Sequence, residues 1–357
     1  MKKKRLPKNR IILLLTACAL AVVCAACVRT HVSLSRSLSS QQAAERFRGE
    51  EGKLRFAQVS VFFPEDGGKQ FQDIYAFRKS IGTALTTASV ETDGTAGVLW
   101  KDAYSAETKL TVKGTKGSAD ADALGVGGDW FFFHDLKLMD GEYIREDDLM
   151  HDRVVLDETL ARKLFGGYDL AGMSVTIGGK DYLIAGVVRR ESDSASAKAY
   201  TAGAGLFLYY DTLNAISETK ISCYELVCAE PISGFTLDLM QKGFADAVAV
   251  QNSGRYSFSS AWKLLKTFSQ RSVVSQPVVY PYWENAARMV EDRALLWRVL
   301  AAVFGAFPAG YALWQLIRAL RRLWAWLKEK AARGWDDLSE AIRKRQRARI
   351  EKKSKTW

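Results

Sequence analysis

Residue types that commonly carry catalysis or bind metals are sparse in this chain. Its three histidines, His31, His134 and His151, have no second ligand at the spacing used by metal-binding helices. The Gly-Gly-Lys run at residues 178–180 lacks both the GxxxxGK spacing and the following serine or threonine of a phosphate-binding loop. It is better explained as a hairpin turn. We therefore predict no catalytic residue, no metal ligand and no cofactor, and we expect any ATPase to be a separate polypeptide.

Acidic residues gather in three clusters, at 65–66, 146–148 and 191–193. Grouped carboxylates can serve acid–base catalysis or bind calcium, but none of these clusters has EF-hand-like spacing. Solvated loop carboxylates are the commoner use of such clusters. An envelope hydrolase is therefore the least favoured of three functional hypotheses.

The five cysteines fall into two groups. Three lie within the apolar residues 11–28, where a thiol behaves as a small hydrophobic side chain. Cys223 and Cys228 lie in residues 221–229, which are predicted to form a strand. Positions five apart on a strand point to opposite faces and are too distant for a disulfide. We expect both to be thiols, and the redox compartment stays undecided.

Two apolar segments, residues 11–28 and 299–317, are each long enough to cross a membrane as a helix. The second is bounded by arginines and flanked by tryptophans, which is typical of membrane interfaces. The first could also be a cleaved signal peptide, with small residues at 24–26, or a lipoprotein signal with its box at 15–18. We favour an uncleaved anchor, because the apolar run continues well past residue 18.

The net charge of +11 is concentrated at the two ends of the chain. Residues 1–10 contribute +6 and residues 318–357 contribute +9, so the segment between them carries −4. Positive charge beside a membrane segment marks its cytoplasmic side. We therefore expect a two-span protein of the cell (plasma) membrane, with both termini cytoplasmic and residues 29–298 extracytoplasmic. Because this large segment is mildly acidic, we expect no nucleic-acid partner.

The tail after the second apolar segment is basic and amphipathic. Apolar residues recur every three or four positions from 316 to 331, with basic residues between them. Such a helix would lie along the inner leaflet of the lipid bilayer, where each basic residue contributes about 1 kcal/mol. A second helix is expected at 338–353. Anchoring is favoured over docking of an ATPase or other partner, and the residues predicted to contact the membrane surface are Arg318, Arg321, Arg322, Lys328 and Arg333.

Hydrophobic periodicity between the apolar segments predicts a mixture of strands and helices. It predicts a strand at 56–63, a helix at 70–88 and, within 94–128, short strand-like pieces such as 109–113. Asp157 is expected to cap the helix that follows it. The remaining predicted strands are 153–156, 175–177, 182–188 and 221–229, and the remaining predicted helices are 158–165 and 259–272.

Residues 125–188 carry a distinctive order of motifs. A Gly-Gly pair and an aromatic run precede Leu-x-Leu-x-x-Gly-x-Tyr at 136–143. Val-Val-Leu-Asp-Glu-x-Leu-Ala-x-x-Leu-Phe-Gly follows at 154–166, and Gly-Met-x-Val-x-Ile-Gly-Gly-x-x-Tyr-x-Ile-Ala-Gly-Val-Val at 172–188. This order resembles the MacB-like periplasmic core domain, the extracytoplasmic part of a class of ABC transporter permeases that includes FtsX-like proteins.

The resemblance implies an α+β fold: a two-lobed extracytoplasmic domain between two transmembrane helices. Residues 55–113 and 230–275 would form a membrane-proximal lobe, and residues 114–229 an inserted, β-rich lobe. The predicted organisation is a cytoplasmic N-terminus at 1–10, a transmembrane helix at 11–28, the core domain at 29–298, a transmembrane helix at 299–317 and a cytoplasmic tail at 318–357.

Permeases of this family normally have four spans, with three after the domain, whereas this sequence has one after it. The resemblance therefore implies a non-catalytic membrane subunit lacking the last two spans, and not an enzyme. Its outer domain would contact a substrate or an envelope partner. A separate ABC ATPase and permease subunits would complete an oligomer or hetero-complex. The alternative is a membrane-tethered sensor or scaffold without transport activity.

Overall fold

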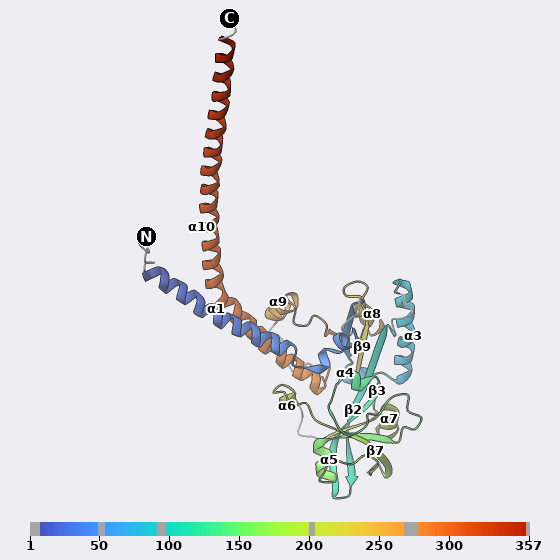
Figure 1. Cartoon of the computed structure of the whole chain (residues 1–357). Helices are drawn as coiled ribbons and strands as arrows, with labels where there is room; N and C mark the ends of the chain where they lie inside the picture. Colours follow the sequence, from blue (N-terminus) through green and yellow to red (C-terminus); the bar gives the residue numbers. More distant parts are fainter. Residues whose placement is uncertain (1–7, 49–53, 91–97, 200–203, 268–277, 355–357) are drawn as a thin grey trace. The chain divides into compact units, whose positions relative to one another are not determined.

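The computed structural model describes residues 8–48, 54–90, 98–199, 204–267 and 278–354 (Figure 1). The chain divides into two compact units. The helical unit consists of Met1–Thr30 and Trp297–Trp357, and the core unit is His31–Leu296.

The core unit is built on a single mixed sheet. Among the described residues, ten strands are joined in the order β10-β1-β9-β2-β3-β8-β5-β7-β4, and β6 pairs with both β2 and β7. The pairs β3–β8 and β5–β7 are parallel, and the others are antiparallel. The strands are β1 (Phe56–Phe62), β2 (Trp100–Gly114), β3 (Gly117–Gly128), β4 (Leu138–Gly141), β5 (Arg153–Asp157), β6 (Ser174–Ile177), β7 (Lys180–Val188), β8 (Ala204–Tyr209), β9 (Cys223–Ala229) and β10 (Val248–Gln251).

Short helices surround this sheet, which confirms the predicted α+β class. Two single turns, η1 (Ser39–Gln41) and η2 (Glu65–Gly67), accompany them. The helices of the core unit are α2 (Ala43–Arg48), α3 (Phe71–Thr87), α4 (Trp130–Phe133), α5 (Glu158–Leu164), α6 (Ser196–Ala199), α7 (Tyr210–Ser217), α8 (Phe235–Gly243) and α9 (Phe258–Thr267).

The long hairpin of β2 and β3 corrects the sequence-based prediction for this region. In place of short pieces, the described part forms strands of 15 and 12 residues, paired from Ala103 with Gly128 to Gly114 with Gly117. Their small residues weaken the strand signal, yet they allow close packing. A side chain at Gly125, for example, would collide with Leu213 of α7.

Side-chain alternation gives the sheet two different faces. We call one the helix face: its core includes Val59, Tyr104 and Leu226 and is covered by α3, α5, α7 and α8. We call the other the network face. Its core includes Phe62 and Trp130 and adjoins α2, α4 and the first turns of the last helix. The predicted division of the domain into two lobes stays a prediction.

Several local predictions are confirmed. The helix expected at 70–88 is α3, and Asp157 caps α5 by accepting a hydrogen bond from the Leu160 amide at 2.6 Å. β6 and β7 form the predicted hairpin, whose turn residues Gly178 and Gly179 both have positive φ. The helix predicted at 259–272 corresponds to α9, but residues 268–272 lie outside the described part of the chain.

The helical unit contains the two apolar segments. They lie within α1 (Lys8–Ser35) and α10 (Tyr282–Ser354), which are both long and apolar enough to cross a membrane. Within the unit, the Cys24 thiol donates a hydrogen bond to the Ala301 carbonyl at 3.3 Å. The expectation of a separate second helix at 338–353 is wrong, because these residues continue α10, which ends at Ser354. One glycine costs a helix only about 1 kcal/mol, which the strong helix formers around it can offset.

Candidate functional site

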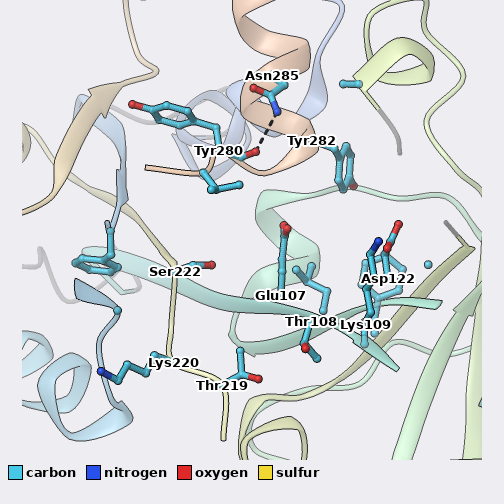
Figure 2. A pocket seen from close by; sticks show the side chains of 18 of the residues that line it. Glu107, Thr108, Lys109, Asp122, Thr219, Lys220, Ser222, Tyr280, Tyr282 and Asn285 are labelled. Carbon is cyan, nitrogen blue, oxygen red and sulfur yellow. Dashed lines mark hydrogen bonds between the residues drawn. The ribbon is translucent and has the colours of Figure 1, made fainter. Parts of the chain in front are cut away.

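A cavity of ≈ 840 Å³ lies in the core unit, beside β2 and β3. Figure 2 shows it between β2, the 219–222 segment and the chain leading into α10. Several of its apolar lining residues belong to the network-face core. The apolar wall is formed by Phe63, Leu124, Leu136, Phe207, Val279 and Tyr280.

Glu107 of β2 presents a carboxylate to this cavity. The β2–β3 register places it opposite Leu124 and diagonal to Asp122, so all three side chains share one face. The Glu107 side chain is exposed, and among the described residues it has no hydrogen bond or ion pair. Figure 2 shows it directed toward the side on which Tyr280 and Asn285 lie.

The environment of Glu107 disfavours its charge. The enclosing protein limits solvation of the carboxylate, and Asp122 adds like charge, so the pKa of Glu107 is raised to about 7. Solvent inside the cavity still reaches the side chain. The group can therefore gain or lose a proton near neutral pH, and it can bind a hydrogen-bonding or cationic group of a ligand.

A second carboxylate, Asp157, helps to shape the cavity wall. Besides capping α5, it accepts hydrogen bonds from Arg190 Nε at 2.5 Å and from the Gly205 amide at 2.7 Å. Burial, only partly opposed by Arg190, raises the pKa of Asp157. A Cβ on Gly205 would lie 3.0 Å from Asp157 Oδ2. These contacts hold the chain after β7 against β5 and β8.

Polar groups buried on the network face form a connected chain. It begins at His134, whose Nε2 lies 2.6 Å from Glu225 Oε2 on β9. The Ser60 hydroxyl donates to the other Glu225 oxygen at 2.8 Å, and Asn252 Nδ2 donates to Ser60 Oγ at 2.8 Å. Asn252 in turn accepts a hydrogen bond at 3.0 Å from Arg255.

Arg255 connects this chain to α10. Its guanidinium donates to both Glu284 oxygens at 2.8 Å and to Glu291 Oε1 at 2.7 Å. Arg288 also donates to Glu284, at 2.9 Å. Burial alone would raise the pKa of Glu284, but the two arginines outweigh burial and hold this pKa below its ordinary value. The sheet is thus joined by charge-assisted hydrogen bonds to the helix that contains the second apolar segment.

A separate cluster lies on the helix face. Arg78 of α3 donates to Asp102 at 2.7 and 3.0 Å and to Glu146 at 2.9 and 2.8 Å. The Tyr224 hydroxyl donates to Asp102 at 2.9 Å. Here burial outweighs the single arginine, so the pKa of Asp102 is raised.

Glu146 also lines a smaller cavity of ≈ 520 Å³. In this cavity the His151 ring stacks on Tyr209, with centroids 4.1 Å apart, and its Nδ1 lies 2.6 Å from Asp211. The other two histidines bond elsewhere: His31 lies 3.0 Å from the Ala294 carbonyl, and His134 contacts Glu225. Within the described ranges, no group of three or more His, Cys, Asp or Glu side chains could hold a metal ion.

The acidic clusters have different roles in the structure. Glu65 and Asp66 line the larger cavity, whereas Glu146 belongs to the Arg78 cluster. Cys223 and Cys228 are buried thiols, and they contribute to the cores on opposite faces, as the strand assignment predicted. The five basic residues predicted to contact the membrane surface lie on α10, and that contact stays a prediction.

Sequence reasoning missed the residues that form the polar network. A signal for Glu225 was present, because an acidic residue interrupts an otherwise apolar strand. Glu284 follows the aromatic lead-in to the last helix, but nothing in the sequence pairs it with Arg255. Glu107 alternates with Lys109 and Thr111, which is typical of a solvated strand face.

These features define a class of protein: an α+β domain between two long apolar helices. The family described as the MacB-like periplasmic core domain matches residues 14–234. This match covers more than half of the chain, so the chain belongs to that family. Its relationship to the periplasmic domains of MacB- and FtsX-type ABC permeases is thereby established.

Solved structures show related similarities. The periplasmic region of MacB from Actinobacillus actinomycetemcomitans is 16% identical, with a TM-score of 0.39 over 60% of this chain and 94% of that one. The extracellular domain of the ABC-type transporter YknZ from Gram-positive bacteria is 15% identical, with a TM-score of 0.35 over 53% of this chain and 91% of that one. No curated protein sequence matches this chain significantly.

Proposed function

We propose that the chain is a non-catalytic membrane subunit related to ABC transporter permeases. Its core unit contacts a substrate or an envelope partner, and a separate ATPase supplies the energy. This proposal rests on membership of the MacB-like family, together with two helices of membrane-spanning length and composition. In the proposed topology both termini are cytoplasmic and the core unit is extracytoplasmic in the cell membrane, because the basic flanks follow the positive-inside rule.

Purification from the organism that encodes the chain tests the proposed partners. The tagged full chain is extracted from membranes in mild detergent, and the proteins bound to it are identified by mass spectrometry. We expect an ABC ATPase and permease subunits. A chain in which Arg318, Arg321, Arg322, Lys328 and Arg333 are replaced by glutamine tests whether recovery depends on the tail. Consistent recovery of signalling or cell-wall proteins instead would favour the sensor or scaffold hypothesis.

We further propose the ≈ 840 Å³ cavity as the place of substrate or partner contact. Its mixed lining, an apolar wall beside the exposed carboxylate of Glu107, is typical of ligand sites. A photoreactive benzoylphenylalanine at position 279 reports on contact, because Val279 lines the cavity and is 59% exposed.

Val98 supplies the matched control for this experiment. It is also an exposed valine, at 66%, and it does not line the cavity. On illumination of cells we expect adducts from position 279 and few from position 98. Equal labelling from the two positions would contradict the assignment of the cavity.

A further inference from the structure

The described surface of the core unit includes an amphipathic helix with an exposed apolar side. Along α9, Phe258, Trp262 and Leu265 follow one another at intervals of four and three residues, so they share one side of the helix. Their exposed fractions are 78%, 54% and 49%. Side chains of this size seldom stand together in water without a binding role.

The start of α9 is fixed close to α10. Arg255, three residues before the helix, donates to Glu291 of α10 at 2.7 Å. Tyr256 packs against a small core that includes Val290, and its hydroxyl donates to Gln41 at 2.7 Å. The beginning of α9 is therefore held at a known level along α10.

This part of α10 precedes the second apolar segment in the same helix. Glu291 precedes residue 299, where the segment begins, by eight residues of continuous helix. At 1.5 Å per residue this is about 12 Å along the axis, and the ten residues of α9 span about 15 Å. The interfacial layer of a bilayer is roughly 5–8 Å thick on each side. Eight helical residues are thus comparable in length to this layer.

The composition of α9 fits a lipid surface. Lys263 and Lys266 lie beside the apolar side chains, and Lys266 Nζ is 5.5 Å from the centre of the Trp262 ring. Tryptophan prefers the interface between headgroups and acyl chains, and lysines attract anionic headgroups. A helix with a bulky apolar side and lysines beside it is typical of a segment that lies in the membrane plane.

We propose that α9 lies on the outer surface of the bilayer, with Phe258, Trp262 and Leu265 inserted among anionic lipids. This inference rests on the proposed function in one respect, since it requires that residues 299–317 span the membrane. It adds a third, peripheral attachment that holds the core unit at a defined height and tilt, close to the Arg255 cluster.

Lipid photocrosslinking of the full chain tests this attachment. The protein is reconstituted in nanodiscs of phosphatidylcholine and phosphatidylglycerol that contain a lipid with a diazirine in its acyl chain, and adducts are mapped by peptide mass spectrometry. We expect adducts in α9 and in residues 299–317, but not in α3, whose Tyr75 is 52% exposed. Omission of phosphatidylglycerol should lower α9 labelling by about fivefold for each lysine that loses its anionic partner.

Variants separate lipid contact from general exposure. Replacing Phe258, Trp262 and Leu265 together by serine should lower α9 labelling by at least about fivefold, because the inserted area is lost. The matched control, Tyr75→Ser, should leave it unchanged. Adducts in 299–317 without adducts in α9 would overturn this inference alone. Absence of adducts from both segments would overturn the proposed topology and this inference together.

Discussion

The two faces of the sheet each hold an arginine between two carboxylates, but the two clusters differ in charge balance and burial. On the helix face, the single cation Arg78 serves Asp102 and Glu146, and the Glu146 side chain is 29% exposed. On the network face, the two cations Arg255 and Arg288 form ion pairs with Glu284, and Arg255 also pairs with Glu291. There the Arg255 and Glu284 side chains are only 4% and 3% exposed.

This difference appears in the protonation of the carboxylates. With one arginine for two acids, burial raises the pKa of Asp102, whereas at the less buried Glu146 the arginine outweighs burial and lowers the pKa. With two arginines for two acids, charge prevails over burial and the pKa of Glu284 is lowered. Glu284 can therefore stay charged inside the protein. The network-face cluster is a suitable rigid joint between the sheet and α10, because each charge is matched by hydrogen-bonded partners.

Removal of the central arginine on the network face should have the largest effect. Arg255→Met leaves Glu284 and Glu291 with fewer partners in a buried site, and we expect the free energy of unfolding to fall by about 3–5 kcal/mol. Urea unfolding of the full chain in detergent, followed by tryptophan fluorescence, measures this change. Arg145→Met is the control, because Arg145 and its partner Asp147 are both 73% exposed. A loss as small as that of the control would contradict the proposed joint.

The charge state of Glu284 gives the next largest effect. Glu284→Gln should cost about 3 kcal/mol at pH 7, because it leaves Arg255 and Arg288 without a full counter-charge. Since the folded-state pKa of Glu284 is below 4.5, the carboxylate stabilises the native protein above pH 4.5. That contribution disappears as pH falls through the folded-state pKa. The stability gap between wild type and variant should therefore narrow in acid, and a gap independent of pH would show that Glu284 is not the titrating group.

Replacing the arginine of the helix-face cluster should lower the free energy of unfolding by less than replacing Arg255. Arg78→Met is expected to lower the free energy of unfolding by about 2 kcal/mol, because solvent can partly replace the arginine at Glu146. The same urea experiment makes the two arginines directly comparable. If Arg78→Met and Arg255→Met lowered the free energy of unfolding equally, the two faces would not differ in how much their arginines stabilise the protein.

Glu107 should give the smallest effect, with the opposite dependence on pH. Because its pKa is about 7 in the folded protein, the native state holds the proton more tightly than the unfolded chain. The contribution of Glu107 to the free energy of unfolding of the wild type therefore falls as pH rises from about 4.5 to about 7. Above pH 7 this contribution is constant. Glu107→Gln should be more stable than wild type at pH 8 by about 1 kcal/mol, after allowance for solvent screening, and similar to it at pH 4.5.

The cavity offers a matched control for this titration. Glu218 also lines the cavity, and Glu218→Gln makes the same carboxylate-to-amide change at a different point of the lining. Paired unfolding curves at pH 4.5 and pH 8 are sufficient. If Glu107→Gln followed the wild-type curve at both pH values, the raised pKa would be wrong.

Much of the local structure follows from the sequence alone. The apolar segments, the strand at β1, the amphipathic α3, the Asp157 cap and the Gly-Gly hairpin all depend on neighbouring residues, so periodicity and turn chemistry predict them. The motifs of 125–188 also predicted the family and, through it, the α+β class. The basic flanks set the expected topology by their charge.

Only the tertiary structure decided which side chains meet. In the β2–β3 hairpin, α7 and Tyr104 of β2 pack closely over Gly125 and Gly127, small residues that carry little strand signal themselves. Arg255 and Glu284 are 29 residues apart, and Glu225 and His134 are 91 apart. Pairing over such distances depends on sheet order and register, which one sequence does not encode locally. For the same reason the sequence did not show that Glu107 lines a cavity.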